Sequence, residues 1–354
     1  MSRFFSHKFD ALTPYVPGEQ PGEKQYVKLN TNENPFPPSP KALLYAREHT
    51  RSPELYSDPE GVELRRALSF LCGVKPEELV LTNGSDEVLN FAFMAFCDQD
   101  HPAVFPDITY GFYPVFCQLN GIPYREIPLK KDFSIDPEDY INARGTVFIA
   151  NPNAPTGMVL PAEAIERILA SDPDRVVVVD EAYVDFGGVS CIPLIRKYPN
   201  LLVTQTFSKS RSMAGARLGF GVGNEELIGD LNTLRYSTNP YNVNSLTLAL
   251  GLGTVLEESY TQRNCAEIVR VREMAAERLK ALGFRLTDSR ANFLFARSDR
   301  IPGEELYRKL KERGILVRHF TKPRIADYNR ITVGTEAQMN TLLEAVEAIL
   351  EERK

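Results

Sequence analysis

The sequence has 354 residues, of which 43% are hydrophobic and 25% are charged, a balance typical of a folded globular protein. A chain of this length exceeds the size at which a single hydrophobic core usually keeps growing, so we expect two domains. The formal net charge is -6, and no cluster of lysine and arginine stands out. This pattern argues against a nucleic-acid partner and favours small-molecule substrates.

The five cysteines and four histidines are scattered along the chain, and no two cysteines form a C-x-x-C pair. We therefore expect neither a disulfide framework nor a metal site. The first twenty residues lack the apolar core of a secretory signal, and no apolar run is long enough to span a bilayer. These features predict a protein without a membrane partner and with a cytoplasmic location.

Residues 1–50 are rich in Pro, Asn and Gly, which predicts an irregular N-terminal arm that packs on another part of the protein. A large domain is expected over residues 51–245, where helical stretches alternate with short runs that are apolar throughout. Strands of this kind are buried on both faces, as in a mostly parallel sheet covered by helices, so the fold class is α/β. The runs are LVLT (79–82), TVFIA (146–150), VVVVD (176–180), LLVTQTF (201–207) and RLGFGVG (217–223).

The pattern changes near residue 245, and a smaller α+β domain is expected over residues 246–354. Long helices are followed by FRLTD, NFLFA, ILVRHF and RITVG, which predict a small sheet. The last helix should place one apolar stripe on this sheet, since its apolar residues recur at helical spacing. The stripe consists of Met339, Leu342, Leu343, Val346, Ile349 and Leu350.

Polar features follow several of the predicted strands, at the sheet edge where ligands bind in open α/β folds. After the first apolar run, Asn83 and Gly84 permit a tight turn, and the amides of Ser85 and Asp86 open a helix. A helix N-terminus suits an anion such as phosphate. Taken alone, the segment is equally an ordinary strand-to-helix turn with a serine cap.

Asp180 ends the most apolar strand, and Tyr183 follows three residues later. A carboxylate buried there needs a cation or hydrogen-bond donors. A protonated pyridine nitrogen would satisfy Asp180, and Tyr183 could donate to a phenolate oxygen of the same ligand. The alternative is that Asp180 caps a turn and Glu181 faces water.

Lys209 lies two residues beyond another buried strand, with Thr206 and Ser208 beside it and Arg217 eight residues later. An apolar or cationic setting would keep the lysine amine deprotonated and nucleophilic, while the hydroxyls and the guanidinium could bind a phosphate. A solvated loop lysine near an unrelated arginine is the alternative. Tyr110, in FPDITYGFYP, could stack on a flat cofactor or be a core tyrosine.

Read in order, these segments resemble the fold-type-I aminotransferases, which use pyridoxal 5'-phosphate, and within them the histidinol-phosphate aminotransferase group. The resemblance covers most of the chain and implies a large domain with a mostly parallel seven-stranded sheet. It also implies an arm that packs on the small domain and on a dimer partner. The motifs that carry it are LNTNENPFPPSP, LYSDPEGVELRRAL, NGSDEVL, PDITYGFY, NPNAPTG, DEAYVDF, TFSKSRSMAGARLGF and RITVGT.

The resemblance implies specific roles around the cofactor. Lys209 would hold it as a Schiff base and then shuttle a proton, while Asp180 would pair with the ring nitrogen. Tyr183 would bond to the ring hydroxyl, and Tyr110 would stack on the ring. The phosphate would be held by Gly84, Ser85, Asp86, Thr206, Ser208 and Arg217.

The resemblance also implies a homodimer in which Tyr56 reaches the cofactor phosphate of the neighbouring subunit. Arg330 would bind the anionic end of both substrates, the phosphate of one and the carboxylate of the other. Tyr15 and Arg318 would help to hold the substrate phosphate, although Arg318 could equally be a surface charge. Asn292 would line the same pocket.

One position departs from the family pattern. Ala154 stands where the family has an asparagine that donates to the ring hydroxyl, with Asn151 and Asn153 just upstream. Either of these asparagines, of which Asn153 is our candidate for the cofactor site, could replace the contact. A water could also do so, or Tyr183 could act alone.

The implied activity is transfer of an amino group from L-histidinol phosphate to 2-oxoglutarate, which gives imidazole acetol phosphate and L-glutamate in histidine biosynthesis. An aromatic amino acid aminotransferase and a threonine-phosphate decarboxylase would share the fold and the cofactor. A regulatory domain that binds the cofactor without turnover is the alternative from another class. Such domains usually carry a DNA-binding segment, and no basic helical extension precedes residue 50.

Overall fold

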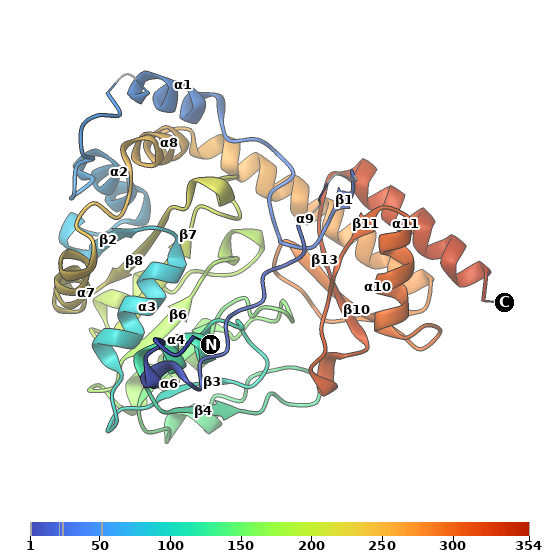
Figure 1. Cartoon of the computed structure of the whole chain (residues 1–354), viewed down its shortest axis with the longest axis horizontal. Helices are drawn as coiled ribbons and strands as arrows, with labels where there is room; N and C mark the ends of the chain where they lie inside the picture. Colours follow the sequence, from blue (N-terminus) through green and yellow to red (C-terminus); the bar gives the residue numbers. More distant parts are fainter. Residues whose placement is uncertain (1, 21, 23–24, 51, 354) are drawn as a thin grey trace.

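The computed structural model describes residues 2–20, 22, 25–50 and 52–353. A seven-stranded sheet forms the centre of the larger part (Figure 1). The strands from β7 to β4 run parallel, and β8 is antiparallel to both of its neighbours. The predicted mostly parallel sheet is therefore confirmed. In spatial order its strands are β2 (Leu79–Thr82), β8 (Gly219–Gly223), β7 (Leu201–Thr206), β6 (Val177–Asp180), β5 (Thr146–Ala150), β3 (Ala103–Pro106) and β4 (Tyr124–Ile127).

Both faces of this sheet are covered, which explains why its strands are apolar throughout. Val177 and Val179 point into one core, whereas Val178 points into the core on the opposite face. The first face is covered by α2 (Val62–Cys72), α5 (Glu138–Ile141) and α6 (Ala162–Ser171). The second face is covered by α3 (Ser85–Phe96), α4 (Tyr113–Asn120) and α7 (Glu225–Thr238).

The smaller part contains a four-stranded antiparallel sheet. Its strands, in spatial order, are β12 (Arg318–His319), β13 (Tyr328–Thr332), β10 (Phe293–Ser298) and β9 (Phe284–Leu286). The helices beside it are α9 (Glu258–Ala281), α10 (Gly303–Glu312) and α11 (Glu336–Glu351). The predicted apolar stripe of the last helix is buried at all six positions and shares one core with this sheet, so that prediction is confirmed.

Two expectations about local structure are wrong. The run ILVRHF forms two strands, because β11 (Ile315–Leu316) leaves the small sheet and pairs in parallel with β1 (Val27–Lys28). The N-terminal arm is also not irregular throughout. It carries β1 and α1 (Pro40–His49), whose start is capped by the Ser39 side chain, with Pro40 at the first helical position.

The predicted domain boundaries remain predictions, and the one at residue 51 lies outside the described residues. The helix α8 (Ser245–Val255), which starts beside the second boundary, packs on α1 and α2. No helix in the described ranges is long and apolar enough to cross a membrane. All five cysteines are free thiols. Short 3-10 segments lie at His7–Phe9, Pro76–Glu78, Val184–Phe186, Ile192–Arg196, Ala214–Ala216 and Pro323–Ile325.

Candidate active site

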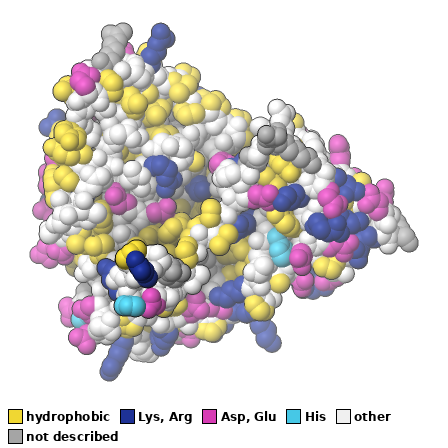
Figure 2. All heavy atoms as spheres, viewed as in Figure 1, with side chains coloured by type: hydrophobic (Ala, Val, Ile, Leu, Met, Phe, Trp, Pro, Cys, Tyr) yellow, Lys and Arg dark blue, Asp and Glu magenta, His cyan; other side chains and the backbone are white. Residues whose placement is uncertain are grey.

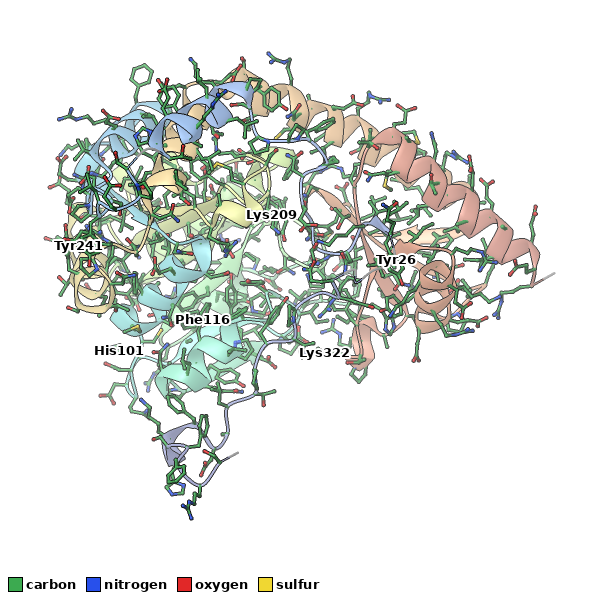
Figure 3. The ribbon with its side chains drawn as sticks, turned by 45° about the horizontal axis from the view of Figure 1, so that its top comes forward. Tyr26, His101, Phe116, Lys209, Tyr241 and Lys322 are labelled. Carbon is green, nitrogen blue, oxygen red and sulfur yellow. The ribbon has the colours of Figure 1, made fainter. Side chains whose placement is uncertain are left out.

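Two adjoining cavities lie where the large sheet, the small sheet and the N-terminal segment meet. Lys209 lies between the two parts of the molecule (Figure 3) and lines both cavities, of about 110 Å³ and about 630 Å³. The structure thus brings together residues that are far apart in the sequence. The smaller cavity is lined by the predicted residues Ser85, Asp86, Tyr110, Asp180, Tyr183, Thr206, Ser208, Lys209 and Arg217.

Asp180 presents a buried carboxylate to the smaller cavity, and its side chain sits at the carboxyl end of β6. The residue is 5% exposed, and burial raises its pKa to about 7, with the charge of Asp86 acting in the same direction. It accepts hydrogen bonds from the Tyr113 hydroxyl and from the backbone N–H of Ala182, both at 3.2 Å. Among the described residues, no ion pair includes Asp180. A ligand that brings a cationic nitrogen would therefore complete its environment.

Lys209 follows β7 and points between the two cavities. Its Nζ donates to the carbonyl oxygen of Thr31 at 3.1 Å. Burial, and then the nearby guanidinium of Arg330, lower the pKa of Lys209 to about 8. Such an amine is partly neutral near neutral pH, which is what a nucleophile or a general base requires.

The turn before α3 and Arg217 form a close pair at the other end of the smaller cavity. Gly84 has φ +75°, and a Cβ atom there would lie 2.6 Å from Nη2 of Arg217, so this approach requires glycine. Arg217 donates to Ser208 Oγ at 3.1 Å and to Asp86 Oδ2 at 3.2 Å. The Asp86 carboxylate accepts bonds from Arg217 and Tyr110, and the backbone N–H groups at this helix start are the donors that an anion could meet.

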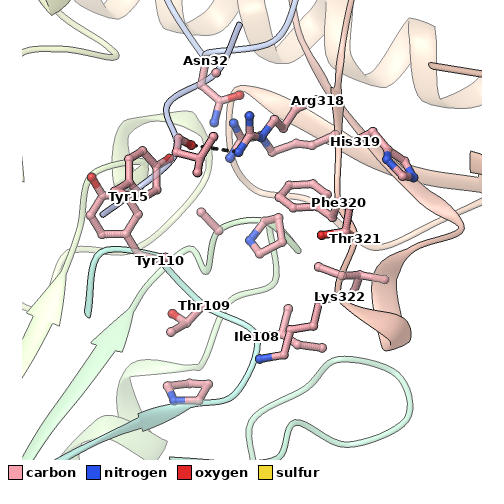
Figure 4. Close-up of a pocket in the computed structure, with 18 of the residues that line it drawn as sticks. Tyr15, Asn32, Ile108, Thr109, Tyr110, Arg318, His319, Phe320, Thr321 and Lys322 are labelled. Carbon is pink, nitrogen blue, oxygen red and sulfur yellow. Dashed lines mark hydrogen bonds between the residues drawn. The ribbon is translucent and has the colours of Figure 1, made fainter. Parts of the chain in front are cut away.

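Aromatic rings line the passage between the cavities. Tyr110 lines both of them and donates its hydroxyl to Asp86 Oδ1 at 2.8 Å. The ring of Tyr15 lies 6.4 Å from that of Tyr110 and 4.6 Å from that of Phe112, measured between centroids. Figure 4 shows Tyr15 beside Tyr110. The N-terminal segment therefore forms part of the cavity wall.

Two arginines line the larger cavity. Arg330, on β13, donates to the carbonyl oxygen of Asn30 at 3.2 Å, while its buried Nε has no partner among the residues that the structure describes. Burial lowers the pKa of Arg330, so an anion would be a favourable neighbour. Arg318 donates to the carbonyl oxygens of Val16 and Pro17 at 3.1 and 3.2 Å. Its side chain thus lies on the cavity wall (Figure 4) rather than out on the protein surface.

The family model for aminotransferase class I and II matches residues 24–346. The chain belongs to this family. It is 48% identical to the histidinol-phosphate aminotransferase of Aromatoleum aromaticum over 99% of this chain and 100% of that protein. It is 46% identical to histidinol-phosphate aminotransferase 1 of Bradyrhizobium diazoefficiens, again over 99% and 100% of the two chains. The solved histidinol-phosphate aminotransferase of Sinorhizobium meliloti, in complex with pyridoxal-5'-phosphate, has the same fold, with a TM-score of 0.90 at 23% identity over 99% of each chain.

In this aminotransferase, neither asparagine upstream of Ala154 turns its side chain to the cavities. Asn153 donates to the Ile108 carbonyl oxygen at 2.9 Å and to Thr156 Oγ1 at 3.0 Å, and lines neither cavity. The side chain of Asn151 is bonded to the Leu160 backbone. The structure thus does not bring Asn153 to the position that we predicted for it.

Two other predicted residues also lie away from the cavity walls. Tyr56 is 83% exposed, and its ring stacks on Tyr241 with centroids 4.4 Å apart. Asn292 is fully buried and donates to the carbonyl oxygen of Asn32 at 3.0 Å, so it supports the wall from behind. Within one chain, the structure places neither side chain in the cavities.

The sequence analysis missed two residues that contact the predicted ones. Tyr113 donates to Asp180, as described above, and Asn32 donates from Nδ2 to the Tyr183 hydroxyl at 2.9 Å. Burial raises the pKa of Tyr183, and the Asn32 contact acts in the opposite direction. Tyr113 begins α4 three residues after the predicted Tyr110, so its closeness in sequence was the one signal that could have marked it. For Asn32 no local signal existed.

Proposed function

We propose that this protein transfers an amino group from L-histidinol phosphate to 2-oxoglutarate, with pyridoxal 5'-phosphate as cofactor, in histidine biosynthesis. The observation that carries the proposal is one arrangement: an amine, a buried acid and an anion-binding turn face one cavity, which adjoins another lined by two arginines. Relatives that match the whole chain at 46–48% identity bear the name of this activity.

The side chains of the smaller cavity fit pyridoxal phosphate. Asp180 is a buried carboxylate that lacks a cation, and it would pair with a protonated ring nitrogen. Ser85, Ser208 and Arg217 would bind the phosphate at the opposite end. When bound, the cofactor supplies an electrophilic carbonyl carbon and a ring that accepts electron density from the substrate Cα.

The chain's own residues would then perform three tasks. Lys209, whose amine is partly neutral, would attach the cofactor and later carry a proton on Nζ to and from the substrate Cα. Asp180 would keep the positive charge on the ring nitrogen. Tyr183 would donate a hydrogen bond to the ring oxygen, while Tyr110 would cover one ring face. The roles of Thr206, Gly84 and the Asp86 amide in phosphate binding belong to the same proposal.

The larger cavity favours an amino donor with a strongly anionic end. Arg330 and Arg318 both line it, and Tyr15 adds a hydroxyl from the N-terminal segment. Two guanidinium groups match a phosphate better than an aromatic side chain. Asn292 would act through Asn32 and not through direct contact with the substrate. An aromatic donor and decarboxylation of threonine phosphate remain the alternatives.

The active protein is proposed to be a homodimer, in the cytoplasm, in which Tyr56 of the partner subunit completes the phosphate site. Figure 2 shows hydrophobic side chains gathered at the upper left, where Figure 1 places α1 and α2. Patches of this kind mark association surfaces. The exposed apolar residues on or next to α1, α2 and α8 are Leu43, Leu44, Leu55, Tyr56, Phe70, Leu71, Tyr241, Leu246 and Leu256.

A half-reaction experiment tests the proposed substrate. The yellow holoenzyme is mixed in turn with histidinol phosphate, phenylalanine and threonine phosphate, without 2-oxoglutarate. We expect histidinol phosphate to bleach the colour fastest, with no carbon dioxide released. A faster response to phenylalanine would favour the aromatic alternative, and release of carbon dioxide from threonine phosphate would favour the lyase.

Borohydride reduction tests the site itself. Treatment of the holoenzyme should attach the cofactor covalently to the peptide that carries Lys209. The exposed Lys197 serves as an internal control, since it is paired with Glu166 on the surface. Label on any peptide other than that of Lys209 would overturn the assignment.

A further inference from the structure

Asn32 donates a hydrogen bond to Tyr183, whereas residue 154, where the family has an asparagine, is an alanine. We propose that Asn32 is a positioning residue that aims the hydroxyl proton of Tyr183 into the smaller cavity, so that Tyr183 can donate to the cofactor without an asparagine at position 154. The inference rests on the proposed function, because the acceptor of this proton would be the ring oxygen of the cofactor.

The orientation of the Asn32 amide is set by Thr332. The backbone N–H of Asn32 donates to Thr332 Oγ1 at 2.9 Å. The hydroxyl proton of Thr332 is then free to donate to Asn32 Oδ1 at 3.0 Å. The opposite orientation of the amide would place two donors on Thr332 Oγ1 and leave the buried hydroxyl proton without this acceptor. Hence Oδ1 faces Thr332, and Nδ2 faces Tyr183.

The orientation of the amide decides where the Tyr183 proton points. Asn32 Nδ2 is a donor and lies 2.9 Å from the Tyr183 oxygen, so the hydroxyl proton cannot point toward it. The ring of Tyr183 is itself fixed, because it packs edge-on against Phe293 with centroids 5.1 Å apart. The proton is therefore left to face the cavity that Tyr183 shares with Lys209 and Asp180.

Asn32 is held firmly enough for this task. It is 1% exposed and has φ +56°, an unusual conformation for a residue other than glycine. Its carbonyl oxygen accepts from Asn292 Nδ2 at 3.0 Å. The preceding residue, Thr31, accepts the bond from Lys209 Nζ. Two neighbouring residues of the N-terminal segment thus contact Tyr183 and Lys209, two of the groups that would act on the cofactor.

Among the described residues, Asn32 is the only amide side chain with a hydrogen bond to the Tyr183 hydroxyl. Ala154 lines both cavities but carries no donor. Asn151 and Asn153 are bonded to groups outside the cavities. Asn32 comes from a different segment and would act on the ring oxygen through the Tyr183 hydroxyl.

A pH titration of the absorbance of the bound cofactor, without any substrate, tests the proposal. We compare the wild type with Asn32→Ala, Tyr183→Phe and the double variant. Loss of an oriented donor makes an anionic ring oxygen bind its proton more tightly. We therefore expect Asn32→Ala to raise the midpoint by about half a pH unit to one unit, a three- to tenfold change in proton affinity. Tyr183→Phe should raise it at least as far, and the double variant should match Tyr183→Phe.

The pair Thr332→Val and Thr332→Ser provides a second measurement that leaves Asn32 in place. Valine removes the hydroxyl that orients the amide, so it should raise the midpoint, whereas serine should keep the wild-type value. An unchanged midpoint in Asn32→Ala, or additive shifts in the double variant, would overturn the proposal. If Asn32→Ala fails to fold, equal midpoints in the two Thr332 variants would overturn it. Failure of wild-type protein to bind the cofactor would instead refute the proposed function.

Discussion

The hydroxyl of Tyr113 lies 3.2 Å from Oδ2 of Asp180, at the buried carboxyl end of β6. Burial raises the pKa of Asp180 to about 7, and the bond from Tyr113 opposes that rise. The carboxylate must be ionised to hold a cationic ring nitrogen. Tyr113 therefore supports the charge state that cofactor binding needs.

Replacing Tyr113 with Phe should weaken cofactor binding at neutral pH by about three- to tenfold, the usual worth of one hydrogen bond. The change also raises the pKa of Asp180, so the loss should shrink as the pH rises. Equilibrium dialysis with pyridoxal phosphate over a pH series measures both effects. The matched control is Tyr140→Phe, since the Tyr140 hydroxyl is buried and has no hydrogen-bond partner in the described part of the chain. Equal losses in the two variants would contradict the role of Tyr113.

In the cofactor-free protein, the buried Asp180 should make the free energy of unfolding depend on pH. In the folded state the pKa of Asp180 is raised from 3.8 to about 7. The protonated carboxyl group therefore contributes fully to stability below pH 3.8, and this contribution is lost as the pH rises through 7. Asp180→Asn removes this titration. Its stability relative to wild type should increase by roughly 2 kcal/mol between about pH 5 and about pH 8.

Urea unfolding of the two cofactor-free proteins at several pH values measures this difference. Glu181→Gln is the comparison, because burial also raises the pKa of Glu181 to about 7, but this carboxylate accepts bonds from Cys191, Ser190 and Gln205. That substitution introduces an amide opposite donors and should destabilise the protein instead. If the free energies of unfolding of Asp180→Asn and wild type differ by the same amount at every pH, Asp180 does not titrate in this range.

Replacing Arg330 with Ala should raise KM for both histidinol phosphate and 2-oxoglutarate by about tenfold or more, since charge-assisted bonds are strong. Arg330 lines the larger cavity, and its buried Nε meets no acceptor among the described residues. Steady-state kinetics with each substrate varied in turn makes the comparison. The control is Arg285→Ala, which removes an exposed arginine paired with Asp299 on the small sheet. A defect in only one substrate would contradict a shared guanidinium.

A mixed dimer tests whether Tyr56 acts across the interface. Lys209→Ala and Tyr56→Ala chains, each poorly active alone, are refolded or co-expressed together. If Tyr56 serves the partner subunit, one of the two sites in the mixed dimer has both native residues, and about half of the wild-type activity per dimer should return. If Tyr56 serves its own chain, neither site is complete and activity stays low. Size-exclusion chromatography of each protein establishes the dimer.

The strands of the large sheet were predictable from the sequence because burial on both faces demands an unbroken apolar run. Asp180 and Lys209 were predictable as site candidates for a related reason, since polar residues directly after such runs must lie at one sheet edge. The helix α11 was predictable because its apolar stripe repeats at helical spacing. In each case the signal is local, because burial of each apolar side chain is favourable by itself, so that the buried positions appear directly in the sequence as apolar residues.

Tertiary structure alone decided which segments meet. β1 pairs with β11, and Val27 lies opposite Ile315, although neither two-residue strand has a pattern of its own. Asn32 reaches Tyr183 across 151 residues of sequence, and Thr31 reaches Lys209 across 178. Such hydrogen bonds depend on the positions of two distant backbones, which the packing of both sheets determines and no local pattern encodes. The sequence therefore determined the acid, the amine and the strands that carry them, while the fold decided which neighbours orient them.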